Sequence, residues 1–203
     1  MPARRVRQPT QRRRRRGRRA KRPTVSFSDL CTNNPAFQSE TPGRTAYLTA
    51  VCVSDLAAGR IQPKVDRLVV DKRARTLTLW YAGFPVRAYR IALGREPLGD
   101  KRHRGDGKTP EGRYWIDGRN PASRFHRSLH VSYPSLSDQR EAIEAGYPAG
   151  GAIMIHGLPA GAGWIGKHHA RLDWTEGCIA VTNEEIDEIW ELVADGTPIE
   201  IRP

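Results

Sequence analysis

Two short apolar runs, at residues 152–155 and 179–181, constrain most strongly how this 203-residue chain can fold. The first run leads into His156, and the second directly follows Cys178. Short apolar runs beside glycine-rich turns are typical of buried strands. Because the histidine and the cysteine are 22 positions apart (178 − 156), they can meet only if the fold makes these strands neighbours. We therefore expect adjacent strands that bring an imidazole to a thiol.

A cysteine thiol needs a proton acceptor before it becomes a useful nucleophile. With an ordinary pKa near ~8.5, only about 3% of it is thiolate at neutral pH. A histidine within hydrogen-bond reach can take the proton and later return it to a leaving amine. Backbone N–H groups of Gly177 and Cys178 would stabilise the resulting oxyanion, at about 3 kcal/mol per donor. The pattern predicts nucleophilic catalysis by Cys178, with His156 as proton donor and acceptor.

The same residues carry a family resemblance. A His-Gly at residues 156–157, followed by Thr-x-Gly-Cys at residues 175–178, resembles the catalytic signature of the L,D-transpeptidases. The likeness includes Thr-Pro-Glu-Gly at residues 109–112 and covers about residues 65–203. It implies a mainly β fold with a few helices, a barrel or sandwich of the L,D-transpeptidase type. It also implies that the carbonyl of Gly157 orients His156.

The resemblance further implies peptidoglycan stem peptides as substrate and a place in the periplasm or cell envelope. The family includes both transpeptidases and L,D-hydrolases or carboxypeptidases, and no residue here decides between an amine and water as acyl acceptor. Two positions depart from the commoner pattern, since Glu176 stands where many members have histidine and Ala180 where many have arginine. We expect Glu176 to be passive, because a backbone oxyanion site would not use its side chain.

Four further residues are candidates for substrate contact. The loop between residues 158 and 172 carries Trp164 and Arg171, and Arg171 could bind a substrate carboxylate or be a plain surface charge. Thr175 precedes the Gly-Cys pair, and His130 could line the cleft or simply face solvent from a strand.

Cofactors and metals are not expected. His156, His168, His169 and Cys178 could be drawn as a zinc site, but no Cys-x-x-Cys or His-x-x-x-His spacing supports one. The polar loop at residues 99–110 ends in Gly-Lys-Thr, yet it lacks the first glycine of a phosphate-binding loop.

Alternating apolar residues and turn signals locate the secondary structure. Three consecutive short strands near the start of the domain favour an antiparallel meander. Thr182 and Glu185 form a capping box, which predicts a capped helix at 183–195, and a shorter helix is expected at 138–145. Trp190 would pack in the core. Strands are expected at residues 66–71, 76–81, 86–93, 112–117, 125–133 and 198–201.

The net charge of +12 belongs to the first part of the chain. Residues 1–25 are Arg-rich and are expected to be a disordered tail, followed by a poorly defined linker at 26–62 and the catalytic domain at 63–203. A rival hypothesis is a protein that binds nucleic acid or an anionic surface through this tail without catalysis. We expect no nucleic acid to be needed for activity.

Export is expected from the resemblance, but the chain shows no convincing signal peptide. Residues 45–53 are a poor hydrophobic core for one, and no run is long enough to span a bilayer. Cys31 and Cys52 could pair if the chain is exported, or stay unpaired. The oligomeric state is not predicted.

Overall fold

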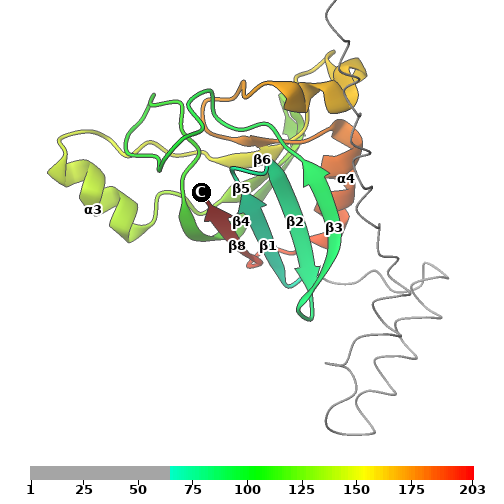
Figure 1. Ribbon diagram of the computed structural model, residues 1–203, viewed down its shortest axis with the longest axis horizontal. Coiled ribbons are helices and arrows are strands. Elements are labelled where there is room, and N and C mark those ends of the chain that lie inside the picture. The colour runs from blue at the N-terminus through cyan, green and yellow to red at the C-terminus, as the bar shows by residue number, and fades with distance from the viewer. Residues whose placement is uncertain (1–64) are drawn as a thin grey trace, which may run out of the picture. The chain divides into compact units, whose positions relative to one another are not determined.

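The computed structural model describes residues 65–203 (Figure 1). The expected tail at 1–25, the linker at 26–62, and Cys31 and Cys52 lie outside the described residues. The described part is mainly β, which confirms the expected fold class. Its strands are β1 (Arg67–Asp71), β2 (Thr76–Tyr81), β3 (Phe84–Arg90), β4 (Gly112–Ser123), β5 (His126–Val131), β6 (Met154–His156), β7 (Ile179–Ala180) and β8 (Pro198–Arg202). Its helices are α3 (Leu136–Glu144), the 3-10 helix η2 (Gly163–Arg171) and α4 (Asn183–Leu192).

The helix termini follow their capping residues. The hydroxyl of Thr182 accepts from the N–H of Glu185, and the Glu185 carboxylate accepts in return from the N–H of Thr182, so α4 begins as expected. The helix ends three residues before the expected 195, because Val193 is already extended. Helix α3 begins two residues before the expected 138, since Ser135 supplies a second capping box there.

The eight strands form one sheet in the order β3-β2-β1-β8-β4-β5-β6-β7. Strands β1, β2 and β3 are the expected antiparallel meander. The C-terminal strand β8 lies inside the sheet, parallel to β1 and antiparallel to β4. The sheet is not closed into a barrel, so the barrel form of the expectation does not apply. A single bridge, Ala92 to Ala180, joins the segment after β3 to β7.

Helix α4 covers part of the sheet and buries Ile186, Ile189 and Leu192 in the core (Figure 1). Trp190 is partly buried and packs against that core, as predicted. The guanidinium of Arg119 lies over its ring, 5.0 Å from the ring centroid. Helix α4 therefore fixes the chain that immediately follows β7.

A buried lysine anchors the loop between β3 and β4. The ammonium of Lys72 donates to the carbonyls of Gly99 (2.7 Å) and Thr109 (2.9 Å) and to Glu111 Oε1 (2.7 Å). The Thr109 hydroxyl, in turn, accepts from the N–H of Gly94 at 3.0 Å. The polar loop at residues 99–110 is thus held at both ends by hydrogen bonds to buried groups.

Replacing Lys72 by Met should lower the free energy of unfolding by about 3 kcal/mol, because it leaves Glu111 and two carbonyls without their partner. Urea unfolding monitored by tryptophan fluorescence would measure it. The matched control is Arg73→Met, since Arg73 is the exposed neighbour. Equal unfolding midpoints for the two variants would contradict the anchoring role.

Candidate active site

Strands β6 and β7 lie side by side and parallel, with Ile155 opposite Ile179 and His156 opposite Ala180. Cys178 directly precedes β7, so the same register puts it beside Met154, two residues from His156. Residues two apart along a strand face the same side of the sheet, about 7 Å apart. The expected neighbouring strands are present, and their register puts His156 and Cys178 on the same side of the sheet. Their action as a catalytic pair stays a prediction.

His156 is held in one orientation by its own neighbour. Its Nδ1 donates to the carbonyl oxygen of Gly157 at 2.7 Å, the contact that the family resemblance implies. Because a carbonyl only accepts, Nδ1 carries the proton and Nε2 is left as an acceptor. The rings of Phe125 and Trp174 lie 4.4 Å and 5.8 Å from the imidazole, which is only 2% exposed.

At neutral pH, the surroundings of His156 and Cys178 favour the neutral form of both groups. Burial lowers the pKa of His156; the carbonyl of Gly157 opposes this effect and the nearby His169 adds to it. Burial raises the pKa of the Cys178 thiol, against the opposing effects of a backbone hydrogen bond at Met154 and the charge of Lys101. The thiol donates to the carbonyl of Ala152, with sulfur and oxygen 3.6 Å apart. This arrangement fits a base that takes the proton during attack better than a resting thiolate–imidazolium pair.

The turn before β7 is shaped by Thr175. This side chain is buried, and its hydroxyl donates to the carbonyl of Cys178 at 2.7 Å and accepts from the N–H of Gly177 at 3.1 Å. The geometry does not support the predicted substrate contact of Thr175, since its hydroxyl is used within the turn. Of the two predicted oxyanion donors, the N–H of Gly177 is engaged by Thr175. The N–H of Cys178 has no hydrogen-bond partner within residues 65–203.

Only glycine fits at position 177. Its φ is +128°, and an added Cβ would come within 2.5 Å of the carbonyl oxygen of Lys108. The loop anchored by Lys72 therefore packs directly against the turn that carries Cys178.

Trp164, Arg171 and His130 do not line the pocket that contains the thiol, whereas Glu176 does. Trp164 is 86% exposed on η2, and Arg171 is exposed at its end. His130 is paired through Nδ1 with the carboxylate of Asp117 on β4. Glu176 forms an exposed ion pair with Arg95. The substrate contacts predicted for Trp164, Arg171 and His130 stay predictions.

A pocket of about 620 Å³ opens beside the thiol. Two of its lining residues, Lys101 and Arg104, were not predicted as site residues from the sequence. They belong to a polar loop that precedes Cys178 by more than 70 residues. The cluster of charged residues at 101–106 is the sequence feature that could have indicated them. The lining residues are Lys101, Arg104, Gly105, Gly150, Gly151, Ala152, Ile153, Glu176 and Cys178.

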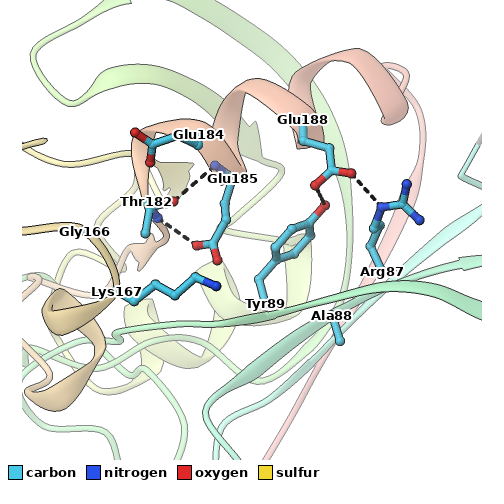
Figure 2. A pocket seen from close by; sticks show the side chains of 9 residues that line it. All are labelled: Arg87, Ala88, Tyr89, Gly166, Lys167, Thr182, Glu184, Glu185 and Glu188. Atoms are coloured by element: carbon cyan, nitrogen blue, oxygen red, sulfur yellow. Dashed lines mark hydrogen bonds and ion pairs between the residues drawn. The ribbon is translucent and has the colours of Figure 1, made fainter. Parts of the chain in front are cut away.

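A second cavity, of about 460 Å³, lies between β3, η2 and the start of α4 (Figure 2). Figure 2 shows Tyr89 and Arg87 both directed at the carboxylate of Glu188, at 3.0 Å and 2.6 Å. Glu185, also in its wall, caps α4. Glu185 and Glu188 are thus used in hydrogen bonds within the domain. The cavity is lined by neither His156 nor Cys178. Within residues 65–203, no group of three or more His, Cys, Asp or Glu side chains is arranged to hold a metal ion.

The model of the YkuD family, described as the L,D-transpeptidase catalytic domain, matches residues 65–201. This chain belongs to the L,D-transpeptidase family. It is 31% identical over 108 residues to YafK of Escherichia coli (strain K12), whose name places it among the L,D-transpeptidases; the match covers 52% of this chain and 36% of YafK. The chain thus spans about a third of the length of the curated relatives it matches.

A solved structure of the same fold is that of Pgp2 from Campylobacter jejuni, a helical cell shape determining protein. It superimposes with a TM-score of 0.54 at 28% identity, over 68% of this chain and 47% of Pgp2.

Thr175→Val should destabilise the domain by about 2 kcal/mol, because the N–H of Gly177 would then be buried without a partner. Thr175→Ser keeps the hydroxyl and is the control. Thermal and urea unfolding of the two variants would measure the difference. A serine variant as unstable as the valine variant would show that the methyl group, not the hydroxyl, stabilises the turn.

Proposed function

We propose that this domain is a cysteine-nucleophile L,D-transpeptidase acting on peptidoglycan stem peptides. The observation that carries the proposal is the parallel pairing of β6 and β7, with His156 and Cys178 on one face and Nδ1 of His156 bonded to the carbonyl of Gly157. Membership of the family supports the same reaction class. The helical cell shape determining protein Pgp2 supports cell-wall remodelling as the process.

The reaction begins with proton transfer. Nε2 of His156 takes the thiol proton as the sulfur of Cys178 attacks the carbonyl carbon on the L side of an L,D peptide bond. The carbonyl oxygen becomes an oxyanion, which the free N–H of Cys178 can bind. When the intermediate collapses, the C–N bond breaks and the amine of the D-residue leaves with the proton from His156. A thioester on Cys178 remains.

An amine or water then resolves the thioester. An amine acceptor yields a cross-link and makes the enzyme a transpeptidase, whereas water yields a shortened peptide and makes it an L,D-carboxypeptidase. Attack by either nucleophile needs neutral His156 to take its proton, which the low pKa of this residue supplies. The first half of the cycle is common to both outcomes.

The cell envelope is the proposed place of action, since the substrate is found there. Within residues 65–203, no helix is long and apolar enough to cross a bilayer. The rival hypothesis, binding through the Arg-rich tail without catalysis, makes the tail essential and Cys178 dispensable.

Incubation of the full chain with purified muropeptides, followed by mass spectrometry, should reveal new cross-links or lost D-residues, and a thioester on Cys178. Cys178→Ala should abolish all three, and His156→Gln should slow acylation by about 10²- to 10⁴-fold. A variant lacking residues 1–25 should keep the activity. Turnover that survives in Cys178→Ala would contradict the proposal.

The acid limb of the acylation rate should have its midpoint below the ordinary histidine pKa of about 6.5, because burial lowers the pKa of His156 and only neutral His156 accepts a proton. Glu176→Gln should leave this profile unchanged, since Glu176 pairs with Arg95. Rapid-quench measurements from pH 4.5 to 8 would test both points. An acid limb that moves in Glu176→Gln would mean that this carboxylate acts on His156.

A further inference from the structure

The pocket of Cys178 has one uncompensated charge among its described residues. Of the ionisable side chains in its wall, Glu176 is paired with Arg95, and Lys101 with Asp106. Within residues 65–203, the guanidinium of Arg104 has no ion-pair or hydrogen-bond partner. It is an exposed cation in the same cavity as the thiol.

The backbone of Arg104 packs against the loop that contains Pro148 and Gly150. Its N–H donates to the carbonyl of Pro148 at 2.8 Å, and its own carbonyl lies 2.9 Å from Nδ1 of His103. An added Cβ on Gly150 would lie 3.3 Å from Cα of Arg104, so the two backbones are closely packed. The ring of His103 lies 5.1 Å from that of Tyr147, on the same pair of loops. The backbone position from which the side chain of Arg104 extends is therefore fixed on the pocket wall.

Lys101 supplies a second, buried cation to this wall. Its side chain is 3% exposed, and its ammonium donates to Asp106 Oδ1 at 2.7 Å and to the carbonyl of His103 at 3.2 Å. An ammonium has three N–H groups, and the third has no partner among the described residues. Burial alone would raise the pKa of Asp106, but hydrogen bonds from Lys101 and three backbone N–H groups lower it to about 2. The carboxylate of Asp106 is therefore ionised at neutral pH, where it holds the ammonium of Lys101 in an ion pair.

We propose that Arg104, with Lys101 behind it, forms a carboxylate subsite for the terminal D-residue of the acyl donor. The inference rests on the proposed function, because that reaction releases a D-residue from the end of a peptide. Its free carboxylate is separated from the scissile nitrogen by a single carbon, so it must lie in the same cavity as the thiol. A guanidinium can bind such a carboxylate through two parallel hydrogen bonds.

The subsite makes the enzyme specific for donors that end one residue after the scissile bond. A donor with a C-terminal amide, or with further residues, has no charge to place against Arg104. The binding energy of the carboxylate would also orient the scissile carbonyl toward Cys178.

The first test needs no enzymatic activity. Iodoacetate and iodoacetamide alkylate thiolates by the same displacement of iodide, and they differ in that only iodoacetate carries a carboxylate. The ratio of their rates at Cys178, read from the Cys178 peptide of the full chain by mass spectrometry, cancels the thiolate fraction. In Arg104→Gln the ratio should fall about 5- to 10-fold, since one charge-assisted contact is lost.

The matched control is Arg102→Gln. Arg102 lies on the same loop and is exposed, but its guanidinium pairs with Glu141 and does not line the pocket. Its ratio should equal that of the wild-type chain. An unchanged ratio in Arg104→Gln, or an equal fall in Arg102→Gln, would overturn the subsite.

The second test uses two stem tetrapeptides that differ only in a C-terminal carboxylate or amide. Arg104→Gln should lower kcat/KM for the acid about 10-fold and leave that for the amide unchanged. Equal losses on both peptides would overturn the subsite. If the wild-type chain acts on neither peptide while the alkylation ratio depends on Arg104, the proposed function fails and the anion site stands.

Discussion

The register between β6 and β7 is the constraint on which the site depends. Because side chains alternate along a strand, a slip of one residue would send Cys178 to the face opposite His156. The register is held from both sides: the N–H of Val181 donates to the carbonyl of His156 at 2.9 Å, and Ala180 exchanges two hydrogen bonds with Ala92. The two-residue strand β7 is thus fixed by its neighbours rather than by its own length.

The loop between β3 and β4 completes this arrangement. Lys72 anchors it from inside the domain, and its backbone at Lys108 leaves room only for glycine at position 177. Its other end carries Lys101 and Arg104 to the pocket. One polar loop therefore shapes the nucleophile turn and sets the charge of the cavity beside it, which links the stability of the domain to the chemistry proposed for it.

The site contains two kinds of titratable group: the imidazole and thiol, whose neutral forms are favoured, and the charged side chains around them. The imidazole is buried beside two aromatic rings and the thiol is partly buried, and desolvation favours the neutral form of both groups. The charged groups lie around them, and most are paired, as Lys101 is with Asp106 and Glu176 with Arg95. In the proposed reaction the proton moves as the sulfur attacks the substrate carbonyl, so the surrounding charges would orient the substrate rather than activate the thiol.

Local signals in the sequence determined the mainly β class, the β1–β3 meander, the capped start of α4 and the two neighbouring strands beside His156 and Cys178. Each of these features depends on residues close together in the sequence or on a short motif with a recognisable spacing. Only the tertiary structure decided that β8 lies inside an open sheet, that the hydroxyl of Thr175 is used within the turn, and that Arg104 shares a pocket with the thiol. Arg104 and Cys178 are 74 positions apart (178 − 104), and contacts over such separations leave no periodic pattern in a single sequence, because they arise from how the strands pack.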